Sequence, residues 1–156
     1  MANKKKLAII VTKGSLDWAY PPFILASTAS ALGYETQIFF TFYGLELLKK
    51  DLKLKVSSLG NPAMPMPVPI PVIMQALPGM SAIMTSMMKK KIKNKGIATI
   101  DELRDLCVEA EVTMIACQMT VDLFDIHHDQ LLSTCEYGGA ATFFEFAGKS
   151  DINLFI

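Results

Sequence analysis

The sequence predicts an α/β fold: a three-layer sandwich in which helices cover both faces of a roughly five-stranded, mostly parallel sheet. Short apolar runs that suit buried strands alternate along the chain with longer segments of helical period. The first two strand-like runs, residues 7–11 and 35–43, flank a helix-length segment, which is the order of a parallel crossover. At 156 residues, we expect a single domain spanning residues 1–156.

Composition and charge narrow the function classes. Apolar residues make up 51% of the chain and charged residues 19%, which is typical of a globular protein. The 15 basic and 15 acidic residues cancel, which argues against a general nucleic-acid binder. However, residues 1–100 carry thirteen basic and four acidic residues, a net of +9, and residues 101–156 carry a net of −9. This division indicates either two solvated faces or a docking surface for a charged partner.

The cysteines and histidines are few. Three cysteines do not make a disulfide framework, and an odd number favours a reducing compartment. The adjacent His127 and His128 have no zinc-ligand spacing and are expected at the surface, so we expect no metal and no cofactor. The basic N-terminus runs directly into a strand, without the apolar segment of a signal peptide. We therefore expect a cytoplasmic protein.

The N-terminal third predicts a strand, a helix and a second strand. Residues 7–11 are a continuous apolar run that ends at a loop. A helix is expected from about residue 18 to 32, with Asp17 as its cap and the Pro21–Pro22 pair in its first turn. Residues 35–43 are aromatic and β-branched, which predicts the second strand, and a short helix is expected at residues 45–50.

A Pro/Met-rich insertion occupies about residues 60–96. Residues 62–88 contain no charge, six of the eight prolines and seven of the ten methionines. The close proline spacing argues against a membrane-spanning helix, because each proline removes a helical hydrogen bond. Residues 80–88 are compatible with a helix and lead into a lysine cluster. We weigh three roles for this segment: contact with another subunit or partner, peripheral contact with an anionic membrane, and a flap over a site.

The C-terminal half predicts three more strands with helices between them. Thr99 and Glu102 form a capping-box pattern. The helix behind it has a core face at residues 100, 103, 106, 107 and 110 and a polar face at residues 101, 104, 105 and 109. Cys107 is therefore expected in the core. Residues 135–139 predict a short strand, residues 140–147 a helix and residues 152–156 the last strand.

Cys117 is the strongest candidate for a reactive group. It ends the uncharged run 112–117, and a helical period begins after it, with Met119, Leu123 and Ile126 on one side. Ligands bind at the carboxyl ends of strands in open α/β sheets, and free N–H groups at a helix start favour a thiolate. The alternative is that Cys117 is a packed, unreactive core residue, since cysteine is often buried.

Five motifs along nearly the whole chain carry a family resemblance: Thr12–Asp17 followed by Ala19–Pro21, Phe39–Leu45, Ala116–Thr120 with Asp122, Tyr137–Phe143, and Asp151–Ile156. In this combination the sequence resembles the DsrE/DsrF-like sulfur-relay family, in particular its peroxiredoxin-like archaeal and bacterial subgroup. The resemblance implies a Rossmann-type sandwich that forms homo-oligomers such as trimers or hexamers. Peroxide reduction is not expected, because no Thr-x-x-Cys pattern is present and Arg104 is the only arginine.

The resemblance also implies a chemistry for Cys117. This cysteine would accept sulfane sulfur as a persulfide, or a thiosulfonate group, and pass it to or from a small TusA-like carrier or a rhodanese. Cys135 would receive sulfur from Cys117 or resolve an intermediate as a disulfide. The expected binding residues lie in the two matching motifs: Lys13, Gly14, Gln118, Met119 and Thr120. Lys13 would add positive charge near Cys117 if their strands are neighbours.

Two functional hypotheses remain. The first is a cytoplasmic sulfur-relay protein that uses Cys117, either as a sulfurtransferase or as a carrier, with a protein partner docked near the Met-rich segment. The second is a non-catalytic, oligomeric interaction module, peripheral to a membrane through the Met/Lys-rich segment, in which Cys117 is only a packed residue.

Overall fold

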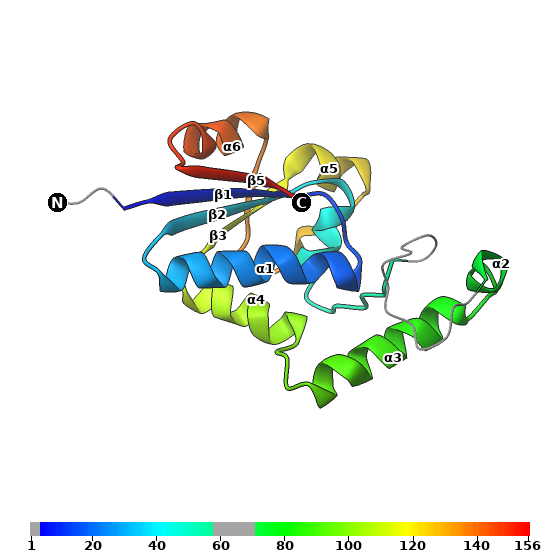
Figure 1. The fold of residues 1–156 in the computed structure, drawn as a ribbon. Helices are drawn as coiled ribbons and strands as arrows, with labels where there is room; N and C mark the ends of the chain where they lie inside the picture. Colours follow the sequence, from blue (N-terminus) through cyan, green and yellow to red (C-terminus); the bar gives the residue numbers. More distant parts are fainter. Residues whose placement is uncertain (1–3, 58–70) are drawn as a thin grey trace.

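The computed structural model describes residues 4–57 and 71–156, which form a five-stranded sheet with helices on both sides (Figure 1). All strand pairings are parallel, and the strand order is β4-β3-β2-β1-β5. In chain order the strands are β1 (Lys6–Val11), β2 (Glu35–Phe40), β3 (Thr113–Cys117), β4 (Glu136–Gly138) and β5 (Ile152–Phe155). The predicted parallel sheet of about five strands is confirmed.

Helices form the two outer layers of the predicted sandwich. Figure 1 shows α1 (Leu16–Ala31) and α4 (Ile100–Glu109) on one face, and α6 (Ala140–Ala147) on the other. The short α5 (Gln118–Leu123) follows β3, and the 3-10 helix η1 (Phe42–Leu48) follows β2. A second 3-10 helix, η2 (His128–Gln130), precedes β4. The remaining two helices, α2 (Val72–Gln75) and α3 (Met80–Asn94), form an arm beside this body.

Strand alternation divides the core into two clusters. Successive residues of a strand point to opposite faces of the sheet. Leu7, Ile9 and Val11 of β1 belong to a large cluster that includes residues of α1 and α4. Ala8 of β1 belongs to a smaller cluster, on the other face, whose members also include Phe39, Ile115, Cys117, Phe143 and Ala147. Cys117 therefore lies under α6, on the face opposite α1 and α4.

The first helix begins earlier than the sequence predicts. α1 starts at Leu16, with Ser15 at the N-cap position, because Leu16 is buried in the large cluster. Pro21 and Pro22 consequently lie inside the helix and not in its first turn. Asp17 does not cap the helix: its carboxylate accepts a 2.8 Å hydrogen bond from the N–H of Ser57. The predicted cap thus joins α1 to the segment that follows η1.

The second strand ends three residues earlier than predicted. β2 stops at Phe40, and Phe42 takes the left-handed backbone conformation (φ 49°) that opens η1. Gly44 allows this turn to cross the end of β1, because a Cβ atom there would collide with the carbonyl oxygen of Val11. The turn directs residues 41–43 away from β2 and toward the start of α5.

The predicted capping box of α4 is confirmed. The Thr99 hydroxyl accepts from the N–H of Glu102 at 3.2 Å, and the Glu102 carboxylate accepts from the N–H of Thr99 at 2.6 Å. Three positions on this helix and its C-cap were predicted wrongly: Leu106 and Ala110 are exposed, and Arg104 is buried. The Arg104 guanidinium donates to the carbonyl oxygens of Leu47 (3.1 Å) and Lys49 (2.6 Å), so it satisfies the end of η1.

The structure describes only part of the predicted insertion. The prolines at positions 62, 65, 67 and 69 lie outside the described residues. The helix expected at residues 80–88 is present and continues to Asn94, so most of the lysine cluster is helical. The N-terminal half of α3 is held to the body by buried Met84 and by the Thr85 hydroxyl, which accepts from the N–H of Val56 at 3.0 Å. Within the described ranges, no helix combines the length and apolarity needed to cross a membrane.

Candidate functional site

Cys117 lies where β3 ends and α5 begins. It is the last residue of β3, pairs with Gly138 of β4, and occupies the N-cap position of α5. Only 5% of the residue is exposed. The predicted position at a strand end and helix start is therefore confirmed, with the thiol partly screened from water.

Hydrogen-bond donors around the sulfur outweigh its burial. Burial raises the pKa of the Cys117 thiol, but hydrogen bonds from the hydroxyl and N–H of Thr120, the Thr41 hydroxyl and the N–H of Met119 lower it. The net pKa is below the ordinary value of 9.0 for a cysteine. These donors favour the thiolate, which is the nucleophilic form of cysteine.

A hydroxyl pair joins the ends of β2 and β3. The Thr120 Oγ1 lies 3.2 Å from the Thr41 Oγ1 and accepts a 3.2 Å hydrogen bond from the N–H of Phe42. When the Thr41 hydroxyl is the donor in this pair, the Thr120 oxygen accepts from both Thr41 and Phe42, and its own proton can donate to the Cys117 sulfur. Thr120 is fully buried. The left-handed turn at Phe42 thus brings a donor from β2 to the thiol of β3.

Thr41 is a residue of the candidate site that the sequence prediction missed. Its position within a predicted strand gave no reason to expect a role, because β2 was extended through Tyr43. The signal that could have found it is Gly44, which together with the preceding aromatic residues indicates a turn at the carboxyl end of the strand.

An exposed apolar surface borders the site. It consists of five side chains from η1 and from α5 and its end, which we call the Cys117 rim: Phe42, Tyr43, Met119, Leu123 and Phe124. The Phe124 ring stacks on Tyr43 at 5.9 Å and meets the edge of Phe42 at 6.3 Å. Met119 and Leu123 lie on one side of α5, as predicted, and that side faces solvent, whereas Thr120 and Val121 are buried.

The predicted binding residues after β3 differ in their roles. Met119 and Thr120 supply N–H groups to the Cys117 sulfur. The side-chain amide of Gln118 instead donates to Asp122 at 2.8 Å, along α5. Of the predicted binding residues, therefore, only Met119 and Thr120 act as donors to Cys117.

Lys13 was predicted beside Cys117 on the premise that β1 and β3 are neighbouring strands, and this premise is wrong. β2 lies between β1 and β3, so the two strands are not neighbours. The Lys13 ammonium lies 3.3 Å from the centroid of the Trp18 ring, in a cation–π contact with α1. Gly14 has a packing role, because a Cβ atom there would collide with the Tyr43 carbonyl oxygen and crowd Glu46. The loop after β1 therefore packs against η1, and η1 in turn borders the site around Cys117.

Cys135 is separated from Cys117. It immediately precedes Glu136, which pairs with Ile115, two residues before Cys117 in β3. Cys135 belongs to the large cluster and Cys117 to the smaller one, so the two thiols lie on opposite faces of the sheet. Burial raises the pKa of Cys135, although a hydrogen bond with Tyr137 opposes this. The structure does not bring together the two cysteines of the predicted relay.

Cys107 occupies the core, as predicted. It is fully buried between α4 and α1, where its thiol donates to the carbonyl oxygen of Phe23 at 3.6 Å. Burial raises the pKa of Cys107 to about 12. His127 and His128 are exposed, as expected, and His128 stacks on Tyr137 at 3.9 Å.

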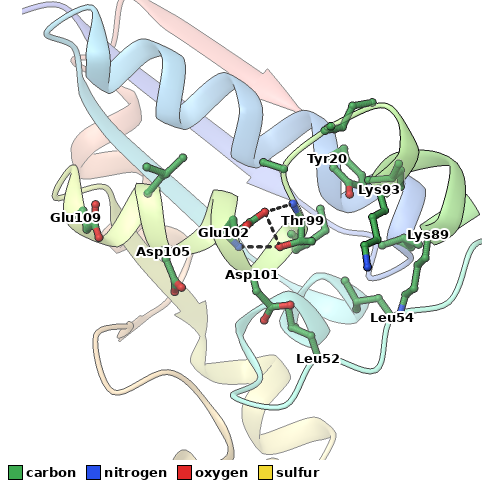
Figure 2. A pocket seen from close by; sticks show the side chains of 17 residues that line it. Tyr20, Leu52, Leu54, Lys89, Lys93, Thr99, Asp101, Glu102, Asp105 and Glu109 are labelled. Carbon is green, nitrogen blue, oxygen red and sulfur yellow. Dashed lines mark hydrogen bonds between the residues drawn. The ribbon is translucent and has the colours of Figure 1, made fainter.

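A cleft of about 1020 Å³ lies away from Cys117, between α3 and α4 (Figure 2). Lys89 and Lys93 stand on one wall, and Asp101, Glu102 and Asp105 on the other. None of the cysteines lines this cleft. Within residues 4–57 and 71–156, no group of three or more His, Cys, Asp or Glu side chains is arranged to hold a metal ion.

Comparison with known proteins extends these observations. The model of the DsrE/DsrF/DrsH-like family matches residues 3–155. The chain is 68% identical over 158 residues to the sulfur carrier protein DsrE2 of Allochromatium vinosum, with 99% of each chain covered. It is 28% identical to the uncharacterized protein YrkE of Bacillus subtilis, with 97% of each covered. The YchN protein of E. coli has a similar fold, with a TM-score of 0.54 at 11% identity over 97% of this chain and 99% of that one.

Proposed function

The chain belongs to the DsrE/DsrF/DrsH-like family, and on that premise we propose that it is a sulfur-relay protein that carries sulfane sulfur on Cys117. The observation that carries the proposal is the set of donors around Cys117, which lower the pKa of a thiol at a strand end. The name of the Allochromatium relative, a sulfur carrier, supports the same class of activity.

The proposed transfer is a redox-neutral exchange. The Cys117 thiolate attacks the outer sulfur of a donor persulfide, a new S–S bond forms at Cys117, and the donor S–S bond breaks. The donor thiolate leaves with the electron pair. The product is a persulfide anion on Cys117, and the N–H groups of Met119 and Thr120 with the Thr120 hydroxyl stabilise its negative charge. Transfer to an acceptor is the same reaction in reverse, and a thiosulfonate group would be carried at the same sulfur.

The structure favours Cys117 as the only sulfur-carrying thiol. Cys107 is fully buried, and burial holds its pKa at about 12. Cys135 lies on the other face of the sheet from Cys117, so direct transfer between them would require rearrangement. We therefore assign the relay to Cys117 and exchange with partner thiols, and we do not assign an internal disulfide.

The proposal includes partners and a compartment. A small TusA-like carrier or a rhodanese would donate or accept the sulfur, and the chain would act as a homo-oligomer. The Cys117 rim offers such partners an exposed apolar surface next to the reactive sulfur. We place the activity in the cytoplasm, because all three cysteines are free thiols and a persulfide carrier requires one.

A second candidate function is a non-catalytic interaction module. The observation that favours it is α3, which exposes Ile83 and Met87 and ends in lysines, a pattern typical of partner or membrane contact. In this case Cys117 would be unreactive, and the protein would bind other subunits or lie on an anionic membrane. Thiol reactivity separates this candidate from the first.

Intact-protein mass spectrometry tests the relay. Reduced protein is exposed to polysulfide and, in a separate sample, to tetrathionate, with Cys117→Ser, Cys135→Ser and Cys107→Ser treated alongside. We expect the mass of one added sulfur, or of a thiosulfonate group, in the wild type and in the Cys135 and Cys107 variants. Loss of the label only in Cys117→Ser supports the relay. An unlabelled wild type, or equal labelling of Cys117→Ser, contradicts it and favours the interaction module.

A further inference from the structure

The α3 helix presents a continuous stripe of apolar and basic residues to solvent. Met87 follows Ile83 by four residues, and Lys90 and Lys91 follow Met87 by three and four, so the four side chains share one broad face of the helix. Ile83 is 56% exposed and Met87 47%. Met84, which follows Ile83, is buried in the large cluster and joins the helix to the body along the border of this face. We call these four residues the α3 stripe.

The other lysines of the helix have a different environment. Lys89 and Lys93 line the cleft and stand across it from the acidic residues of α4 (Figure 2). This arrangement gives them opposite charges nearby within their own chain. Lys90 and Lys91 are exposed and do not line the cleft. The α3 stripe is therefore a separate surface.

The Cys117 rim has the complementary composition. Tyr43 is 68% exposed and Met119 63% exposed. Asp122 and Asp125, both exposed, lie within and next to the rim residues of α5 and its end. The rim is thus apolar with negative charge, whereas the α3 stripe is apolar with positive charge. Apolar contact together with opposite charge is a basis for specific docking.

The two surfaces cannot meet within one chain in the observed arrangement. Figure 1 shows α3 below the layer of α1 and α4, and α5 above the sheet. They can meet between chains. Such a contact joins two different patches, so it is head-to-tail, and contacts of this kind build rings when the rotation closes.

We propose that the α3 stripe of one chain docks on the Cys117 rim of a second copy of the chain. Lys90 and Lys91 then pair with Asp122 and Asp125, and Ile83 and Met87 cover the aromatic residues of the rim. The contact itself is independent of the sulfur chemistry. Its consequence, that the second copy controls which donors reach Cys117, rests on the proposed function.

Charge reversal tests the contact. Lys90→Glu/Lys91→Glu reverses the stripe, and Asp122→Lys/Asp125→Asn reverses the rim, with Asn chosen because it tolerates the left-handed conformation of residue 125 (φ 50°). Lys4→Glu/Lys5→Glu is a control with the same charge change as the stripe variant, placed just before β1, at the other end of the sheet from Cys117. Sedimentation velocity measures self-association, and alkylation kinetics measure access to Cys117.

We expect each reversed variant to self-associate at least about tenfold more weakly than the wild type, and the control to be unchanged. Mixing the two variants, or combining both changes in one chain, restores association. The stripe variant, which changes no residue near Cys117, alkylates Cys117 faster than the wild-type oligomer does. Sulfur loading is measured separately by mass spectrometry. A Cys117 that takes up no sulfur would therefore contradict the relay but not the contact between chains.

Three results overturn the proposal. The wild type is monomeric at every concentration tested, the reversed variants keep the wild-type mass, or the combined change fails to restore association. A fourth measurement identifies the other occupant. If Lys90→Glu/Lys91→Glu keeps the wild-type mass but no longer sediments with vesicles containing anionic lipid, α3 is a membrane-binding surface and the proposal is wrong.

Discussion

Cys117 and Cys107 are both buried thiols, but they lie on opposite faces of the sheet in contrasting surroundings. Cys107 is packed between two helices, where its thiol donates to a carbonyl oxygen, and the backbone hydrogen bond of Ser27, which lowers its pKa, does not offset its burial. Cys117 sits at a strand end, where the hydroxyls of Thr41 and Thr120 and the N–H groups of residues 119 and 120 lower the pKa of its thiol. Burial raises both pKa values, but only at Cys117 do hydrogen bonds reverse the effect.

This contrast shows that location in the topology decides the chemistry of a buried cysteine. The N–H groups of a helix interior are already bonded, whereas those at a helix start are free. The Thr41 hydroxyl, at the end of the neighbouring strand β2, reaches the same site only because the turn into η1 points toward α5. The lowered pKa of Cys117 therefore depends on two segments, one after β2 and one after β3.

The largest expected effect is a difference in alkylation rate within one molecule. Iodoacetamide at neutral pH should modify Cys117 at least about a hundredfold faster than Cys107 in the folded protein. The cause is the thiolate fraction, which is very small for a thiol whose pKa is about 12. Peptide mass spectrometry over time measures both rates in the same sample.

Denaturant supplies the control for this comparison. In urea the two cysteines lose their different surroundings, so their rates should become similar. Equal rates in the folded protein would show that the donors around Cys117 do not stabilise its thiolate, and would remove the physical basis of the relay.

The sequence predicted the elements whose signals are local. The helix at residues 140–147 and the capping box of Thr99 and Glu102 were placed correctly, because period and cap chemistry are contained in a few adjacent residues. Cys117 was placed at a strand end for the same reason, since the apolar run before it ends abruptly.

The wrong or missed predictions concern contacts between segments that are far apart in the sequence. Lys13 was expected beside Cys117, but the order of strands in a sheet is not contained in either loop. Arg104 was assigned to the polar face of α4, yet the carbonyl groups at the end of η1 draw its guanidinium inward. Thr41 was missed because the left-handed turn at Phe42 depends on an acceptor, Thr120, that lies far away in the sequence.

The second-largest expected effect comes from removing the Thr120 hydroxyl, which joins the start of α5 to the turn after β2. Thr120→Val keeps the size of the side chain but removes the donor to Cys117 and the acceptor for Phe42. We expect alkylation of Cys117 at neutral pH to slow about tenfold and the midpoint of its pH–rate profile to rise. The unfolding free energy should fall by about 1–3 kcal/mol, because the Phe42 N–H loses its partner.

Two variants control the Thr120 experiment. Thr120→Ser keeps the hydroxyl and should retain the wild-type midpoint, although it removes a buried methyl group. Thr41→Val removes a single donor and no acceptor for Phe42, so its midpoint should rise less than that of Thr120→Val. If Thr120→Val and the wild type share one midpoint, Thr120 is a structural residue and does not position the thiolate.

The smallest effect is a dependence of stability on alkaline pH that comes from the other face of the sheet. Unfolded Cys107 loses its proton near its ordinary pKa of 9.0, whereas folded Cys107 keeps it until about 12. Between these values the folded state binds more protons, so stability falls as pH rises, with a slope approaching about 1.4 kcal/mol per pH unit. Below pH 9 both states are protonated and Cys107 contributes no slope.

Comparison with Cys107→Ala isolates this contribution. The variant loses some stability at every pH because it leaves a small cavity, but its urea-unfolding free energy should decline less steeply than that of the wild type above pH 9. Cys117 should act in the opposite direction: its lowered pKa stabilises the fold as pH rises through that pKa, and the gain is lost as pH falls through it. Parallel slopes for wild type and Cys107→Ala would mean that Cys107 ionises without unfolding, and that its surroundings are less restrictive than its complete burial indicates.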